Sequence, residues 1–233
     1  MTMNYEYPPS ATPLDPDEAE GLLLPHITNR TELDRWEQDN IAEAETWAFR
    51  RKPKDLLSID FVCRLHARMF GNVWRWAGEF RISGKNIGVD RWSIGPELKL
   101  LEDVKTWIEF NVYEPDEIAA RFHHRLVSIH PFVNGNGRHA RLMTDLLLVH
   151  ILGRPRFTWG SENLVQVGDC RQRYIAALQA ADGREYGPLL EFFTHGNKKS
   201  TWPIKAKCLI SGGPCRIRTY DQLIKSQLLY QLS

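Results

Sequence analysis

The sequence has no paired cysteines and no long apolar run. Its four cysteines form no CxxC pair, so their spacing favours neither a zinc ribbon nor a disulfide framework. The longest apolar stretch, residues 146–152, is interrupted by a histidine and is far shorter than the roughly 18 residues that a membrane-spanning helix needs. A secretory signal has a basic segment followed by an apolar one. Residues 1–21 contain no such pair of segments. We therefore expect a cytoplasmic protein that does not enter a membrane.

An excess of charge of one sign is also absent. The chain has 30 Lys and Arg residues against 29 Asp and Glu residues, a formal net charge of +1, which gives no general attraction to nucleic acid or to an anionic membrane. We expect no direct nucleic-acid binding by the main domain. Hydrophobic residues make up 42% and charged residues 25% of the 233 residues. This composition excludes collagen-like and wholly disordered classes and indicates one large globular domain with extensions.

Four segments of the chain differ in composition. Four prolines within residues 1–20 oppose regular structure, which predicts an extended N-terminal arm. Helical spacing then predicts an N-terminal helical region at 21–54 that packs on a core domain at 55–196. Residues 197–233 hold seven basic residues and one acid, and we expect a disordered or artefactual tail there. A basic arm that contacts nucleic acid or a partner is the alternative.

The spacing of apolar residues favours a mostly α architecture. Apolar residues recur every three or four positions, and capping residues and prolines mark the segment ends, among them Thr31 and Ser58 as helix starts. Between 79 and 94, two short β-capable runs flank the turn-prone Gly84-Lys85-Asn86, which predicts one β-hairpin. We expect helices over residues 31–52, 58–71, 95–108, 116–130, 138–152, 171–182 and 188–195.

The most informative stretch is residues 130–141, which read HPFVNGNGRHAR. This order predicts a helix end before a proline, a tight polar loop and the start of a long apolar helix. Gly135 and Gly137 allow a close approach of the backbone, and the backbone N–H groups at a helix start favour an anion. Arg138 and Arg141 are three residues apart, lean to the same side and carry guanidinium groups that grip phosphate oxygens. The loop therefore predicts a site for a di- or triphosphate.

His130 stands immediately before this loop. An imidazole near its ordinary pKa accepts a proton from a hydroxyl group at neutral pH, so a base beside a phosphate site indicates phosphoryl or nucleotidyl transfer to a hydroxyl. The side-chain carbonyl of Asn134 offers an oxygen to Mg²⁺, which prefers oxygen ligands and phosphates. Among the other histidines, His66 lies on an apolar helix face and is interpreted as a core residue. For His139, the sequence leaves open whether it lines the mouth of the site or faces solvent.

Residues 130–141 resemble the signature of Fic-domain proteins, HPFx(D/E/N)GNGRxxR, at every defined position. The general resemblance covers roughly residues 55–196. The chain is also similar to the Fic subfamily labelled mobile mystery protein B, through PHITNRTELDRWEQDNI, GKNIGVDRW and HPFVNGNGRHARLM. The resemblance implies an all-α Fic-type (Fido) domain with a β-hairpin flap over the active site.

The resemblance also implies an activity, the transfer of AMP from ATP, with Mg²⁺, to a Ser, Thr or Tyr hydroxyl of a target protein. It makes His130 the general base that deprotonates this hydroxyl. It assigns the nucleotide phosphates to Gly135, Asn136, Gly137, Arg138 and Arg141. The flap would bind the target peptide as an added strand, through Ile82, Ser83, Gly84, Lys85, Asn86, Ile87, Gly88, Val89 and Trp92. The subfamily is typically paired with a helix-turn-helix companion of the mobile mystery protein A type, which the resemblance implies as a second partner.

Asn134 departs from the commonest family residue at this position, which is Asp or Glu. Its neutral side chain predicts weaker Mg²⁺ binding than a carboxylate would give. Two alternatives to AMP transfer therefore stay open. One is a kinase-like phosphotransferase of the same fold, as in the Doc branch, and the other is a weakly active nucleotide-binding regulator paired with the helix-turn-helix companion.

Autoinhibition in the family uses a helix with the pattern (S/T)xxxE(G/N). Residues 158–163, TWGSEN, fit these letters, but the internal glycine and the proline just before indicate a loop. Near the N-terminus, Glu20-Gly21 has Pro16 where the pattern requires Ser or Thr. The sequence therefore establishes no inhibitory helix in its N-terminal part, and the resemblance to the subfamily fits inhibition by a separate partner.

Overall fold

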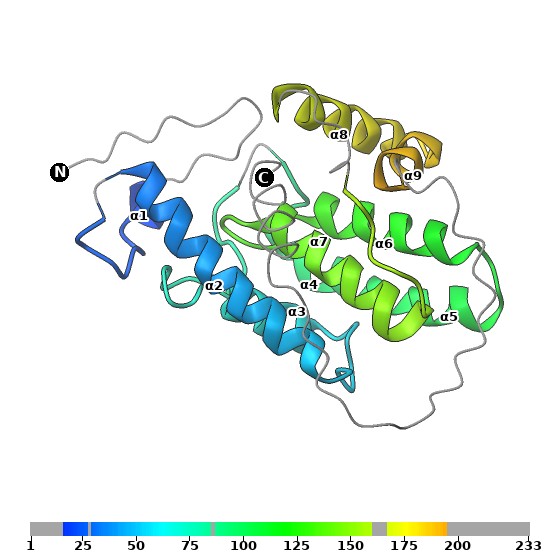
Figure 1. Cartoon of the computed structure of the whole chain (residues 1–233), viewed down its shortest axis with the longest axis horizontal. Helices are drawn as coiled ribbons and strands as arrows, with labels where there is room; N and C mark the ends of the chain where they lie inside the picture. Colours follow the sequence, from blue (N-terminus) through cyan, green and yellow to red (C-terminus); the bar gives the residue numbers. More distant parts are fainter. Residues whose placement is uncertain (1–15, 28, 85–86, 160–166, 195–233) are drawn as a thin grey trace, which may run out of the picture.

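The structure is a computed structural model that describes residues 16–27, 29–84, 87–159 and 167–194. Most of the predicted N-terminal arm, the basic tail at 197–233 and most of the 158–163 pattern lie outside the described residues, as do Lys85 and Asn86 of the predicted flap. Over the described ranges the chain is mostly helical, which confirms the expected architecture (Figure 1).

The helices follow the predicted order, with shifted ends. The short helices η1 and η2 are of the 3₁₀ type, and η3 is a π-helical continuation of α7. The elements are α1 (Pro16–Ala19), α2 (Arg30–Arg50), α3 (Ile59–Phe70), η1 (Arg91–Ser93), α4 (Ile94–Lys99), η2 (Leu100–Glu102), α5 (Asp103–Glu109), α6 (Pro115–Ile129), α7 (Asn136–Leu147), η3 (Leu148–Leu152), α8 (Val167–Asp182) and α9 (Gly187–Thr194).

Capping residues explain several helix ends. Ser58 begins α3 as predicted, because its hydroxyl accepts a hydrogen bond from the backbone N–H of Phe61 at 3.1 Å. The helix expected to start at Thr31 begins earlier, since the Asn29 side chain accepts from the N–H of Glu32 at 2.9 Å. Residues 16–19, expected to be part of the extended arm, form α1, which a proline opens at the first helical position.

Two groups of buried apolar side chains hold the helices together. In Figure 1, α2 and α3 lie side by side, α6 and α7 form the middle of the molecule, and α8 and α9 lie beyond them. The first group joins α2 and α3 to α6 and α7, and includes Phe61, Leu65, Phe122, Met143 and Leu146. The second joins α6 to α8 and α9, and includes Ala119, Ala120, Tyr174, Leu189 and Phe193. Each large apolar side chain buried in this way stabilises the fold by roughly 1.5–3 kcal/mol, so both groups fix the α6–α7 pair from opposite sides.

The predicted β-hairpin is not present in the described part of residues 79–94. Phe80 instead forms an isolated antiparallel bridge with Phe132, and residues 91–93 form a 3₁₀ turn. The physical reason is that side chains satisfy the carbonyls that a second strand would use. Arg81 donates to the carbonyls of Ser83 and Val89, and Arg91 donates to that of Ile82. We keep the name flap for residues 82–92, which form an irregular loop where the structure describes them.

No helix in the described ranges is both long and apolar enough to cross a membrane.

Candidate functional site

His130 lies where α6 ends. Its backbone is in the left-handed region, φ 51° and ψ 60°, which stops the helix before Pro131 as the sequence predicted. The residue is 8% exposed. The backbone N–H of His130 still donates to the carbonyl of Leu126 at 3.3 Å, while its own carbonyl accepts from the side chain of Arg81 at 2.7 Å. The imidazole is therefore carried on a backbone that contacts fix from both sides.

The loop after His130 is braced from within by Asn136. The Asn136 side-chain oxygen accepts from the backbone N–H of Phe132 at 2.9 Å, and its amide donates to the carbonyl of the same residue at 2.8 Å. This side chain therefore shapes the loop. Because the side chain is used within the loop, a phosphate bound at Asn136 would contact its backbone N–H, which lies in the first turn of α7.

His66 and His139 lie on the core side of the loop. Gly78 N–H donates to Nδ1 of His66 at 2.9 Å, so Nε2 carries the proton and donates to the carbonyl of Asn134 at 3.0 Å. The His66 ring also stacks on Phe132, with centroids 3.7 Å apart. His139 is fully buried and its Nε2 lies 3.0 Å from the carbonyl of Val62. This confirms the interpretation of His66 as a satisfied core histidine and answers the open question about His139, which faces the core.

Three buried histidines should make the fold sensitive to acid. Burial lowers the pKa of His66 and His123 well below the ordinary 6.5, and that of His139 to about 3. As the pH falls below 6.5, the unfolded chain gains protons at these three sites and the folded chain does not, so stability present above pH 6.5 is lost. Asp145, whose pKa burial raises to about 6, opposes this with one proton. The three histidines outweigh this single carboxyl group, so the free energy of unfolding should fall as the pH is lowered from 6 to 5. Urea unfolding at pH 6 and pH 5 measures it, and equal free energies would contradict the prediction.

Gly135 and Gly137 have different tasks. Gly135 has φ +75°, and a Cβ atom there would lie 2.4 Å from Cζ of Phe70, so both conformation and space require glycine. A Cβ on Gly137 would meet nothing within 4 Å. The structure thus places Gly135 as the residue that lets the loop pack on α3, and Gly137 on the open side of the turn.

This difference predicts opposite effects for two alanine variants. Gly135→Ala should lower the free energy of unfolding by about 1–3 kcal/mol, through backbone strain and the clash with Phe70. Gly137→Ala should leave stability nearly unchanged, and should weaken ATP binding because its added methyl stands at the open turn. Urea unfolding and ATP titration of both variants check this. Similar stability in the two variants would contradict the packing role of Gly135.

Arg138, the predicted phosphate clamp, is paired with Glu37 of α2. Its Nη1 lies 2.6 Å from Glu37 Oε2, and the two side chains are 5% and 3% exposed. The other Glu37 oxygen accepts from the indole N–H of Trp74 at 2.5 Å. The guanidinium also lies over the ring of Phe70, 4.8 Å from its centroid. A phosphate group that binds Arg138 must therefore compete with a buried carboxylate.

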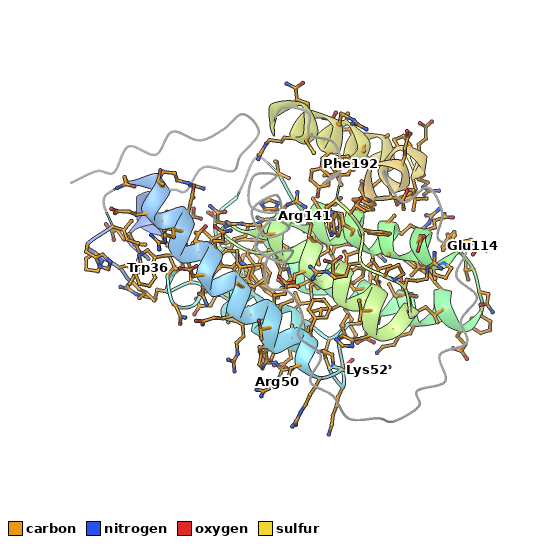
Figure 2. The ribbon with its side chains drawn as sticks, in the orientation of Figure 1. Trp36, Arg50, Lys52, Glu114, Arg141 and Phe192 are labelled. Atoms are coloured by element: carbon orange, nitrogen blue, oxygen red, sulfur yellow. The ribbon has the colours of Figure 1, made fainter. Side chains whose placement is uncertain are left out.

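Arg141 extends from α7 toward Tyr174 of α8. It is fully buried, and its guanidinium lies over the ring of Tyr174, 4.9 Å from the centroid. Figure 2 shows the labelled Arg141 in the interior, between α7 and α8. The Tyr174 hydroxyl in turn lies 2.7 Å from Nε2 of His123. Burial lowers the pKa of Arg141; the charge of Tyr174 opposes this shift, and the charges of Arg171 and Arg138 reinforce it.

Asn134 would offer one neutral oxygen to a metal ion. Its Oδ1 accepts from the N–H of Gly135 and retains a second lone pair. In the described residues, no group of three or more His, Cys, Asp or Glu side chains is arranged to hold a metal. These residues fit an Mg²⁺ ion that is held mainly by nucleotide phosphates and water, as Mg²⁺ usually is in such sites.

The flap lies against His130 through Gly88 and Val89. The N–H of Val89 donates to the carbonyl of Ile129 at 3.4 Å, and a Cβ on Gly88 would lie only 2.7 Å from Cβ of His130. The outer side of the flap carries apolar side chains that face solvent, Ile82 at 81% and Trp92 at 76% exposed. The flap is thus brought against His130 by Gly88 and Val89, and Trp92 belongs to η1 and not to a strand.

Two residues of this site were missed by reasoning from the sequence, Glu37 and Arg81. Glu37 occupies the buried face of α2 together with Leu33 and Ala44, and a carboxylate at helical spacing within an apolar stripe was a usable signal. Arg81 gave no comparable signal, because its partners are the backbone carbonyls of Ser83, Val89 and His130, which no pattern of side chains marks. The structure gathers His130, Asn134–Arg138 and the flap in one place, and sets Arg141 deeper, beside α8.

The central part of the chain is similar to a known family. Residues 56–148 match the model of the Fic/DOC family. Protein adenylyltransferase fic-1 from Caenorhabditis elegans is 29% identical over 187 residues, which are 77% of this chain and 35% of that protein. The chain spans about a third of the length of the curated relatives it matches.

Solved structures have a similar fold. Residues 134–508 of Fic-1 from C. elegans superpose with a TM-score of 0.55 at 26% identity, covering 75% of this chain and 51% of that one. The N-terminal Fic domain of a VirB-translocated Bep effector protein from Bartonella quintana, solved with bound ADP, has a TM-score of 0.55 at 18% identity. It covers 72% of this chain and 86% of that one, and it supports the fold alone.

Proposed function

Because the chain carries a Fic/DOC (Fido) domain, we propose that it is a protein adenylyltransferase that moves AMP from ATP to a hydroxyl side chain of a target protein. The observation that carries this proposal is the position of His130 at the end of α6, directly before a glycine loop, the N-terminus of α7 and Arg138. A base, a phosphate site and a guanidinium are what nucleotidyl transfer to a hydroxyl requires. The names of the relatives, protein adenylyltransferases, support the same reaction.

The chemical step follows from these positions. The imidazole of His130 takes the proton of a Ser, Thr or Tyr hydroxyl of the target, whose oxygen attacks the α-phosphorus of ATP. The new P–O bond forms as the bond between the α-phosphorus and the bridging oxygen breaks, and pyrophosphate leaves. The loop at Gly135, through the backbone N–H groups of Asn136 and Gly137, and the guanidinium of Arg138 hold the phosphate oxygens and stabilise the charge that develops on them.

Arg141 and Asn134 have supporting tasks in this proposal. Arg141 adds positive charge beneath the phosphates from its buried position over Tyr174. Asn134 would hold Mg²⁺, and the ion, when bound, neutralises phosphate charge. The flap, through Ile82, Trp92 and its neighbours, would bind the target peptide, since its exposed apolar side chains adjoin the base.

Glu37 weakens ATP binding by competing for Arg138. Since Arg138 is paired with this buried carboxylate, nucleotide phosphate and Glu37 compete for one guanidinium. The chain as it stands is then a weakly active enzyme, and release of Glu37 raises its activity. The N-terminal segments similar to mobile mystery protein B support the finer proposal that the chain belongs to that subfamily and has a helix-turn-helix companion.

The experiment that tests the proposed reaction uses the protein with Mg²⁺ and, in separate arms, α-labelled and γ-labelled ATP. Host lysate supplies targets, and protein-bound label is measured on a gel. We expect label from the α position only, and none of it with His130→Ala. Label from the γ position alone would contradict AMP transfer and identify a phosphotransferase.

A further inference from the structure

Arg81 stands at the start of the flap, outside the 130–141 motif, and is almost fully buried, at 3% exposed. We propose that Arg81 is a positioning residue that holds the flap and the backbone of His130 together as one unit. The proposal rests on the proposed function, because it assigns a task within the same site. It is carried by four hydrogen bonds and one close backbone contact.

The first part of this arrangement is the closure of the flap on itself. Nη1 of Arg81 donates to the carbonyl of Ser83 at 3.1 Å, and Nη2 donates to the carbonyl of Val89. These carbonyls are six residues apart, yet they meet the same planar group. A guanidinium presents its N–H groups in a rigid fork, so Arg81 fixes the two ends of the flap relative to each other.

The second part is the bond to the base. Nε of Arg81 donates to the carbonyl of His130 at 2.7 Å, and the backbone N–H of Arg81 donates to the carbonyl of Pro131 at 2.9 Å. His130 has φ 51°, a conformation that costs a non-glycine residue roughly 1–2 kcal/mol and persists only when its surroundings hold it. Arg81 is the described side chain that binds the peptide group directly after this strained residue.

The third part is direct contact between flap and base. Gly88 has φ +106°, and a Cβ there would lie 2.7 Å from Cβ of His130 and 2.8 Å from Nη2 of Arg81. The flap backbone therefore touches both residues with no room for a side chain. Burial lowers the pKa of Arg81 and the charge of Asp90 opposes this, so a nearby carboxylate supports the charged guanidinium.

Arg81 thus positions both the flap that binds the target peptide and the imidazole that deprotonates this peptide. A displacement of either one moves the other through Arg81. This differs from a role in flap stability alone, because the flap and the 129–132 peptide groups then gain or lose order together.

Hydrogen exchange of the full chain, followed by mass spectrometry, tests the proposal without ATP or a target, so its outcome is independent of AMP transfer. In Arg81→Ala, exchange should rise in peptides covering both 82–90 and 129–132, and stay unchanged in α8. Millimolar guanidinium chloride should restore protection in both peptides together, whereas urea at the same concentration should not. Arg81→Lys, which keeps a charge and loses the fork, should behave like the alanine variant.

Arg91→Ala is the matched control. Arg91 donates to the carbonyl of Ile82 at 3.0 Å and lies over the ring of Trp92, so its loss should raise exchange in the flap and leave 129–132 protected. As a second readout, the imidazole NMR signal of His130, assigned with His130→Gln, should shift in Arg81→Ala and return with guanidinium. Exchange that rises in the flap alone in Arg81→Ala, or a His130 signal that does not move, would overturn the proposal.

Discussion

Glu37→Gln should bind ATP on the order of tenfold more tightly than the unchanged chain, and should transfer AMP faster at limiting ATP. The reason is that Glu37 holds Arg138 in a buried ion pair at 2.6 Å, and a hydrogen bond between charged groups contributes about 1.5–3 kcal/mol. Since about 1.4 kcal/mol is a factor of ten in affinity, removal of the competing charge predicts an effect of this size. Glutamine retains the shape of the side chain and an oxygen for the indole N–H of Trp74.

The same variant should be less stable without nucleotide. Its Arg138 keeps a buried charge without the carboxylate of Glu37, which is costly, and bound phosphate should offset this cost. ATP should therefore raise the melting temperature of Glu37→Gln more than that of the unchanged chain. Glu45→Gln is the control, because Glu45 lies on the same helix and pairs with Arg156. An ATP affinity that rises equally in both variants would show a general effect of charge and contradict a specific role of Glu37.

His130→Ala should lower the rate of AMP transfer by a factor on the order of 10²–10⁴, the usual contribution of a general base. ATP affinity should stay as in the unchanged chain, since the phosphates are assigned to the α7 N-terminus and Arg138. The Cβ that packs against Gly88 and the carbonyl that accepts from Arg81 both remain. Labelled-ATP transfer and ATP titration measure the two quantities separately.

The left-handed backbone of His130 calls for a second variant. Alanine is less favoured than histidine at φ 51°, whereas asparagine tolerates this conformation well. His130→Asn should therefore retain the loop and lose the base, with the same loss of transfer. Activity that survives in the asparagine variant would show that His130 acts through the backbone and not as the base.

Much of the helical fold could be predicted from the sequence because the signals for helix ends are local. Ser58 as a cap and the proline after His130 each act within four residues, and both mark helix ends that the structure contains. The motif was readable for the same reason, since its glycines, histidine and arginines lie within twelve residues. Their spacing alone places them on one loop and one helix start.

The remainder depends on contacts between distant residues. Glu37 and Arg138 are 101 positions apart, so neither residue signals the other, and reasoning from the motif predicted only a phosphate role for the arginine. In the described part of residues 82–92 no hairpin is present, and Arg81 donates to carbonyls that the alternation of side chains assigns to a partner strand. Arg141 lies over the ring of Tyr174 of α8, and the periodicity of α7 carries no information on that contact.

The most direct test of the account compares protein-bound label from α-labelled ATP for Glu37→Gln and for the double variant Glu37→Gln/His130→Ala, with the same lysate and Mg²⁺. We predict stronger labelling of target proteins by Glu37→Gln than by the unchanged chain, and loss of that labelling in the double variant. Equal labelling by the two variants, or no labelling by Glu37→Gln, would contradict a site in which His130 is the base and Glu37 competes with ATP for Arg138.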